Sequence, residues 1–470
     1  MDNTLDLFDQ TFSSLERATG VLGLLQCVWV YDRGIDIDGL RRFHRKLLRG
    51  RLSRRIERSA LPFGRDRWVS SSGRSRLEIV ATPRPRDEFD GWLREQAATP
   101  LDAERGPEWH LAMLPFTDGG AGISLVIPHA LTDGIGLCDA LADAAAGRAD
   151  PVSWPPAASR RLWQALREDA RQTARDIPGI GRALAGVARQ ARAGSAQAGP
   201  PRAPSAAADQ PVTLPTETVF VDAGEWDARA EALGGTSNTL LAGLAARLAE
   251  RAGRVTTDGR VTLAIPVNER TAGDTRANAV ANADITVDPA PAASDLRAIR
   301  AATKRALTRL RDTPDRRREL LPLVPLMPRR LIRRIVGVAA GSPTAVVASN
   351  IGDLKPGVCR PDGADADHFA IKAPHPDATT AVMDRFGGML SLASGRANGQ
   401  VFVSVVAYQP GRPNSNEGLR RDLSAALSDF SLDATIGFAC PGPASTTRKS
   451  VESRLIPTIA DKRDAAAAAS

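Results

Sequence analysis

The stretch GISLVIPHALTDGIGLCDAL, residues 122–141, decides how this chain folds. GISLVIP is a short continuous apolar run, which predicts a buried β-strand. GLCDALADAAAG, which begins at residue 136, predicts a helix. His129, Asp133 and Gly134 stand between the two. We therefore expect His129 at the end of a buried strand, with its side chain facing a cleft, and Asp133 at the start of a helix.

The plain interpretation of this pattern needs no chemistry. A carboxylate at the start of a helix accepts backbone N–H groups and lies favourably in the helix dipole, so Asp133 suits an N-cap. Gly134 suits the turn, and His129 would be a core histidine whose hydrogen bonds are satisfied. Because His-x-x-x-Asp-Gly specifies only three residues, the pattern alone favours this interpretation.

The flanking segments alternate between strand-like and helix-like patterns. LLQCVWVYD and EWHLAMLPF predict strands, whereas residues 37–50 and 160–190 carry apolar side chains at helical spacing. In the second half, TAVVASN and QVFVSVVAY predict strands, and TSNTLLAGLAARLAERAG predicts a helix capped by Thr236 or Ser237. This alternation predicts the α/β class.

The length and composition predict two domains. A chain of 470 residues is too long for one ordinary core. ARAGSAQAGPPRAPSAAADQPVT has no apolar period and cannot bury enough surface to order itself, which indicates a linker. We expect a first domain over residues 1–190, a linker over 191–214, a second domain over 215–445 and a tail over 446–470.

Charge and cysteine content limit the function classes. The net charge is +8, but no Cys/His cluster, basic arm or RNA-binding aromatic motif accompanies it. The charge therefore suits an anionic lipid or an acyl-coenzyme A at least as well as nucleic acid. Four cysteines lie far apart, which predicts neither disulfides nor a zinc site. MDNTLDLFDQ lacks the pattern of a signal peptide, and VLGLLQCVWV is about half a membrane span, so we expect a cytoplasmic protein.

The strand–His-x-x-x-Asp-Gly–helix arrangement resembles the signature of the coenzyme A-dependent acyltransferase superfamily. This superfamily contains chloramphenicol acetyltransferase, the condensation domains of nonribosomal peptide synthetases and the wax ester synthase/diacylglycerol acyltransferases. The last branch is similar over the greatest length, through FSSLERATG, TPLDAERGPEWHLAMLP, IPVNERTAGDTRANAV and ASNIGDLKPG in that order. The family usually carries two adjacent histidines in the motif, and here Pro128 replaces the first.

The resemblance implies two α/β domains of the chloramphenicol acetyltransferase type in one chain, with the site in a tunnel at their interface. His129 would be the general base. Asp133 would turn away from the cleft to pair with an arginine, for which Arg55, or else Arg54, in LSRRIER is the candidate. An exposed surface charge is the alternative for each arginine.

The resemblance also implies substrate contacts. Gly134 would let the backbone pass close to the substrate. Ser349 and Asn350 would donate to the oxyanion of a tetrahedral intermediate, although a strand-ending Asn can instead satisfy its own turn. Arg270 and Asn278 shape the interface or simply order their loop.

The remaining candidate residues have plain interpretations. Cys138 suits a small buried apolar residue. His44 and His110 belong to amphipathic elements, and His368 and His375 to a polar loop whose spacing fits no metal site. Residues 316–337 fit either a core helix broken by prolines or a basic helix at a membrane surface.

The implied activity is acyl transfer from acyl-coenzyme A to the hydroxyl of an alcohol, lipid or glycolipid, with no separate cofactor, no metal and no nucleic acid. Peripheral membrane contact would suit such an acceptor. One alternative is a free-standing condensation-type enzyme that takes donors from a carrier protein. Another is a non-catalytic acyl- or lipid-binding protein of the same fold.

Overall fold

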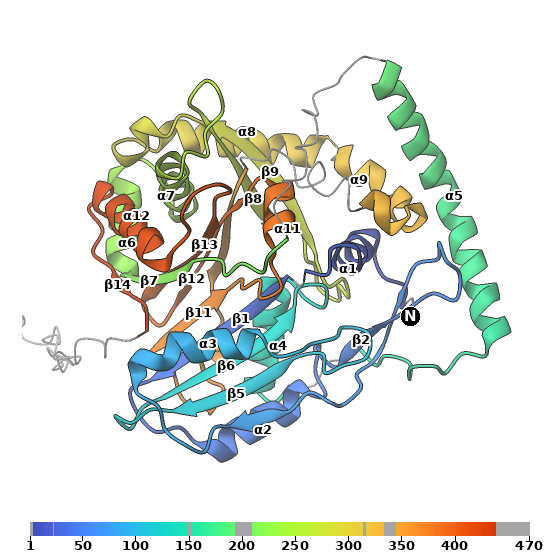
Figure 1. The fold of residues 1–470 in the computed structure, drawn as a ribbon, viewed down its shortest axis with the longest axis horizontal. Helices are drawn as coiled ribbons and strands as arrows, with labels where there is room; N and C mark the ends of the chain where they lie inside the picture. Colours follow the sequence, from blue (N-terminus) through green and yellow to red (C-terminus); the bar gives the residue numbers. More distant parts are fainter. Residues whose placement is uncertain are drawn as a thin grey trace, which may run out of the picture. The chain divides into compact units, whose positions relative to one another are not determined.

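A computed structural model of the chain describes residues 3–21, 23–148, 152–192, 209–313, 316–332 and 345–438. These residues form an α/β fold built on two main sheets (Figure 1). Residues Met1–Cys440 form one compact unit. The predicted boundaries at residues 190 and 215 therefore stay predictions, and most of the predicted linker lies outside the described residues.

The first sheet has five strands in the order β11-β1-β6-β5-β4. Their bounds are β1 Leu24–Tyr31, β4 Leu77–Ile79, β5 His110–Pro115, β6 Ala121–Pro128 and β11 His368–Lys372. Every residue of β6 is buried, as its continuous apolar run predicts. The strand lies antiparallel between β1 and β5, so the residue after it emerges from the middle of the sheet.

Strand β11 comes from the second half of the chain and pairs with β1 (Figure 1). The prediction of a polar loop around His368 is wrong, because HFAIK is a fully buried strand. The flanking sequence hides it, since aspartates precede the strand and prolines follow it. The first sheet is therefore complete only with residues from the far end of the chain.

The second sheet has seven strands in the order β14-β7-β13-β12-β10-β8-β9. Their bounds are β7 Thr216–Asp222, β8 Val261–Asn268, β9 Val280–Val287, β10 Val346–Asp353, β12 Met389–Ala397, β13 Gln400–Tyr408 and β14 Thr435–Ile436. A separate hairpin pairs β2 Arg54–Glu57 with β3 Arg67–Ser70.

The described helices lie around these sheets, apart from one long helix that stands to one side (Figure 1). They are α1 Leu7–Thr19, α2 Ile37–Leu47, α3 Phe89–Ala97, α4 Gly134–Ala145, α5 Leu162–Arg192, α6 Ala223–Ala232, α7 Ser237–Arg251, α8 Arg297–Asp312, α9 Arg316–Leu320, α11 Thr380–Phe386 and α12 Asn416–Asp429. Short 3₁₀ turns are η1 Arg86–Glu88, η2 Ala290–Ala293, η3 Leu321–Leu326 and η4 Pro356–Cys359. Thr236 caps α7, as its position predicts.

Two large hydrophobic cores accompany the sheets. One includes Trp29 and Trp109 from the first half of the chain together with Phe369 and Phe402 from the second. The other is drawn wholly from residues 219–432. The two halves are therefore interlocked at the first core rather than merely placed side by side.

The arginine-rich segment over residues 316–337 is described as far as residue 332. It contains the short helix α9, followed by the 3₁₀ turn η3, which holds Pro322 and Pro325. Proline removes a backbone donor and clashes with the preceding turn, which accounts for the early end of the α-helix.

Candidate active site around His129

His129 follows the last residue of β6, as the sequence predicts. Its backbone N–H donates to the carbonyl oxygen of Gly23 at 2.7 Å, at the entry to β1. Pro128 lies opposite Leu24 in the sheet. Burial lowers the pKa of His129, while the charge of Asp133, its own backbone carbonyl and the Asn278 side chain raise it. With burial dominant, the imidazole is neutral at physiological pH.

Asp133 both caps α4 and makes a buried ion pair. Its Oδ1 accepts the N–H of Gly136 at 2.6 Å, the contact of an N-cap. Its Oδ2 accepts from Arg270 Nη2 at 2.7 Å, and each of the two side chains is only 5% exposed. The same guanidinium donates to the carbonyl oxygens of Arg276 and Ala277, both at 2.9 Å. Asp133 thus joins the motif to a loop of the second half.

The arginine that pairs with Asp133 is Arg270, so the prediction of Arg55 is wrong. Arg55 lies in β2 and donates to the carbonyl oxygen of Glu104 at 2.9 Å, away from α4. Arg54 comes closer, because it donates to the carbonyl oxygens of Leu131 and Thr275. Its guanidinium covers the ring of Trp68 at 4.1 Å.

Gly134 and Gly136 both sit at tight places in the motif. A Cβ added to Gly134 would lie 3.3 Å from Cδ1 of Ile351, a residue of β10. A Cβ on Gly136 would lie 2.9 Å from Thr132 Oγ1 and 3.1 Å from Arg270 Nη2. The end of β10 therefore packs on the start of α4, and the ion pair leaves no room for a side chain at Gly136.

The predicted oxyanion donors, Ser349 and Asn350, lie in β10 immediately before Ile351. Asn350 Oδ1 accepts the N–H of Gly352 at 2.9 Å, so this residue satisfies its own turn. Its Nδ2 donates to Asn238 Oδ1 at 2.5 Å. Both the oxygen and the nitrogen of the Asn350 amide therefore have a partner. The strand end lies close to the motif, because Ile351, the next residue, packs against Gly134.

Two aromatic rings near His129 were not predicted. The ring of Phe12, on α1, stacks on the His129 ring, with centroids 5.2 Å apart and planes 10° apart. His375 lies beyond β11, where the carbonyl oxygen of Pro374 accepts the N–H of Leu24 at 3.4 Å. Burial, with a smaller contribution from the charge of His129, lowers the pKa of His375 to about 4. The position of Phe12 in the resembling FSSLERATG segment was the one available signal.

Cys138 and the histidines outside the motif lie in the packed elements of the fold. Cys138 is a buried free thiol of α4, and burial raises its pKa. His44 lies on α2 and His110 on β5. His368, in β11, contacts Gln400 and the ring of Phe220. No group of three or more His, Cys, Asp or Glu that could hold a metal ion occurs within the described residues.

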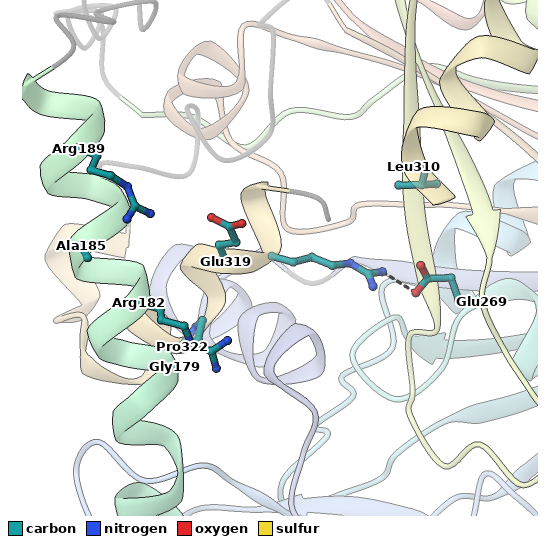
Figure 2. Close-up of a pocket in the computed structure, with 9 residues that line it drawn as sticks. Gly179, Arg182, Ala185, Arg189, Glu269, Leu310, Glu319 and Pro322 are labelled. Atoms are coloured by element: carbon teal, nitrogen blue, oxygen red, sulfur yellow. Dashed lines mark hydrogen bonds and ion pairs between the residues drawn. The ribbon is translucent and has the colours of Figure 1, made fainter. Parts of the chain in front are cut away.

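A pocket of about 650 Å³ opens elsewhere, between α5 and α9. Figure 2 shows Arg182 and Arg189 projecting from α5 toward α9, which carries Glu319. Arg318 donates to Glu269 at 2.7 Å, which is the dashed contact in the figure. Glu269 precedes Arg270 in the chain, so the pocket adjoins the loop that reaches Asp133, yet none of the predicted site residues lines it. None of the described helices is both long enough and apolar enough to span a membrane.

Comparison with solved structures places this arrangement among known folds. The first condensation domain of the CDA synthetase matches with a TM-score of 0.55 and 14% identity, over 92% of this chain and 96% of that one. The wax ester synthase/diacylglycerol acyltransferase of Marinobacter aquaeolei VT8 matches with a TM-score of 0.52 and 16% identity, over 91% and 98%. Polyketide synthase associated protein 5 from Mycobacterium tuberculosis matches with a TM-score of 0.50 and 15% identity, over 91% and 97%.

Sequence comparison adds no closer relative. No protein-family model matches the chain, and no curated protein matches it significantly. The likeness therefore lies in the arrangement of strands and helices over almost the whole described chain. The chain has the α/β fold of the condensation domains and the wax ester synthase/diacylglycerol acyltransferases, which is the fold that its motifs predict.

Proposed function

We propose that this protein is an acyltransferase that moves an acyl group from acyl-coenzyme A to the hydroxyl of an alcohol, lipid or glycolipid, with His129 as general base. One observation carries the proposal. The His129 imidazole, whose pKa burial lowers, is held beside the Asp133–Arg270 ion pair where the two halves of the chain meet. The fold of acyltransferases supports it.

The neutral ring suits proton transfer. A ring nitrogen of His129 takes the proton of the acceptor hydroxyl while the oxygen attacks the thioester carbonyl carbon. The tetrahedral intermediate then collapses, the C–S bond breaks, and the imidazolium returns the proton to the leaving thiolate. The products are an ester and free coenzyme A. No acyl-enzyme is needed, and burial keeps the Cys138 thiol protonated by raising its pKa.

Ser349 and Asn350 are the proposed donors to the oxyanion. Their strand end packs on Gly134 through Ile351, which puts it at the motif. Asn350 would have to exchange its bond to Asn238 for the oxyanion. In this proposal the donor and acceptor meet in the interface tunnel that the family resemblance implies.

Peripheral membrane contact is the remaining part of the proposal, and α5 supports it. This helix leaves Trp163 82% exposed, Ile177 60% exposed and Leu184 55% exposed, and arginines flank them. Apolar side chains bordered by basic ones suit an anionic lipid surface. Trp163→Ser should weaken co-sedimentation with anionic vesicles, and equal sedimentation of both proteins would contradict the contact.

The deciding experiment compares wild type with His129→Ala. Both are given acyl-coenzyme A of several chain lengths with a panel of alcohols, and release of free thiol is measured. We expect His129→Ala to lose about 100-fold or more in kcat, the usual contribution of a general base. A folded variant that is as active as wild type would show that His129 is not the base.

Two further arms separate the alternatives. The same acyl group is supplied on a carrier protein, and amines are supplied as acceptors. Turnover only with the carrier-bound donor would indicate the condensation-type enzyme. Acyl-ligand binding that His129→Ala leaves unchanged, without turnover in any arm, would indicate a binding protein.

A further inference from the structure

Asp9 is a buried carboxylate on the side of α1 that faces the candidate site. Its side chain has no exposed surface. Phe12, three residues further along the same helix, stacks on the His129 ring, and residues three apart share a helix face. Burying a carboxylate costs free energy unless hydrogen-bond donors satisfy it. The donors to Asp9 therefore show which part of the chain it holds in place.

The donors come from the second half of the chain. Asp9 Oδ2 accepts the N–H of Ala277 at 2.9 Å, and its Oδ1 accepts the N–H of Asn278 at 2.8 Å. Asp133 Oδ2 takes the next N–H, that of Ala279, at 2.9 Å. Two carboxylates, one on α1 and one at the start of α4, therefore hold three consecutive peptide groups.

These contacts fix the side-chain amide of Asn278. An amide nitrogen carries two hydrogens. One is directed to Asp9 Oδ1 at 3.2 Å and the other to the carbonyl oxygen of His129 at 3.1 Å. With both committed, the amide cannot turn over. Its Oδ1 is buried without a hydrogen-bond partner among the described residues, as is Nδ1 of His129. The same side chain opposes the effect of burial on the pKa of His129.

We propose that Asp9 is a positioning residue that fixes the Asn278 amide against His129 and so selects the tautomer and orientation of the imidazole. Asp9 acts through Asn278 and touches no reacting atom. The effect on rate rests on the proposed function, whereas the effect on the imidazole is independent of any substrate.

The positioning depends on the charge of Asp9. Burial raises the pKa of Asp9 to about 6, against the lowering effects of the Ala277 N–H, Arg54 and the Asn278 N–H. The charged groups that surround Asp9 and the peptide groups of residues 277–279 are Asp6 on α1, Arg54 on β2, Asp133 before α4 and Arg270. A proton on Asp9 turns an accepting oxygen into a donor, which removes a contact to Asn278 below about pH 6.

Nuclear magnetic resonance can test the positioning directly. The chain has five histidines, so selective ¹⁵N-histidine labelling gives few ring signals, and His129→Ala assigns those of His129. Near neutral pH we expect one neutral tautomer in wild type, because the two contacts of the Asn278 amide hold it in a single orientation. In Asp9→Asn an NH₂ group replaces an accepting oxygen, so we expect a mixture of tautomers.

Kinetics supply a double-mutant cycle. If Asp9 acts through Asn278, Asp9→Asn and Asn278→Ala each lower kcat by a similar factor, roughly tenfold, and the double variant is no slower than either. We expect KM for the acyl donor to change little, because neither side chain binds it. Independent effects would instead multiply.

Asp169 provides the matched control. It is another buried carboxylate, which accepts the N–H of Ala60 at 2.9 Å and the Ser59 hydroxyl at 2.7 Å. Asp169→Asn should lower the stability of the protein while leaving the His129 signals and kcat unchanged. It thus separates loss of a buried carboxylate from loss of this one.

Unchanged His129 signals in a folded Asp9→Asn protein, or factors that multiply in the double variant, would overturn the inference. If Asp9→Asn does not fold, Asn278→Ala carries the comparison, since it leaves both backbone contacts of Asp9 in place, and unchanged signals there would overturn the inference equally. If His129→Ala is fully active while Asp9→Asn still changes the ring signals of His129, the proposed function fails. The inference that Asp9 positions the imidazole then stands.

Discussion

Arg270 Nη2 lies 2.7 Å from Asp133 Oδ2, and both side chains are almost entirely buried. Removing one partner of a buried pair leaves an uncompensated charge, so Arg270→Ala should cost about 3–5 kcal/mol of unfolding free energy. Arg148→Ala is the control at the other end of α4, where an exposed pair with Asp143 has the same 2.7 Å separation. There we expect less than about 1 kcal/mol. Equal losses in urea unfolding would show that burial does not decide the outcome.

Gly136→Ala should damage the same ion pair without touching either charge. The new Cβ would lie 2.9 Å from Thr132 Oγ1 and 3.1 Å from Arg270 Nη2, so one of them must move. We expect a loss of about 1–3 kcal/mol and a lower kcat. Gly181→Ala on α5 is the control, because its Cβ meets nothing within 4 Å. That variant should gain about 0.5–1 kcal/mol from helix propensity, and a loss at both sites would contradict the steric account.

Glu16→Gln should change how stability depends on pH. Burial raises the pKa of Glu16 to about 8, against the lowering effects of the Gly23 N–H and Arg17. The folded state therefore holds this proton more tightly than the unfolded state, and wild type loses stability as the pH rises from about 4.5 to about 8. Glutamine does not titrate, so the variant should gain about 2–4 kcal/mol relative to wild type between those limits. Glu231→Gln, at an exposed glutamate of α6, should show no such gain, and parallel curves for Glu16→Gln would contradict the prediction.

His375→Asn should change the stability at acid pH, where the effect of pH runs opposite to that of Glu16. Burial lowers the pKa of His375 to about 4, so the unfolded chain binds this proton first as the pH falls. Wild type then loses stability between about pH 6.5 and pH 4, by up to about 3 kcal/mol from this group. The variant should lack that part of the acid loss. Guanidinium unfolding at a series of pH values measures the difference, and an equally steep loss in both proteins would rule His375 out.

Cys138→Ala should retain activity. Burial raises the pKa of this thiol, which keeps it protonated and unreactive, and the proposed chemistry passes through no acyl-enzyme. Intact-mass measurement during turnover should show no acyl adduct on wild type. An adduct that Cys138→Ala abolishes, together with loss of turnover, would replace the direct transfer by a covalent route.

Local patterns predicted the local parts of this structure. The apolar run of β6, the cap of α4 and the helical spacing of α5 each depend on neighbours in sequence, so they can be read from it. For the same reason the sequence places His129 correctly at the strand end. What the residues do there stays a prediction until activity is measured.

The contacts that join the two halves could not be read in this way. Asp133 and Arg270 are 137 positions apart, and Asp9 lies 268 positions from Ala277. The sequence holds many arginines that could pair with one carboxylate. The predicted partner, Arg55, instead donates to the carbonyl oxygen of Glu104. The sequence did not predict strand β11, because its five residues lie between polar segments and form a strand only by pairing with β1.

The pairing of β11 with β1 also sets an order for synthesis. Until Lys372 has left the ribosome, β1 stays without one of its two neighbours and presents an open, apolar edge. After β6 ends at Pro128, the sheet thus stays unfinished during the translation of more than 200 further residues. We expect a nascent chain that stops before residue 368 to need a chaperone, and the released full-length chain to close the sheet and dispense with it.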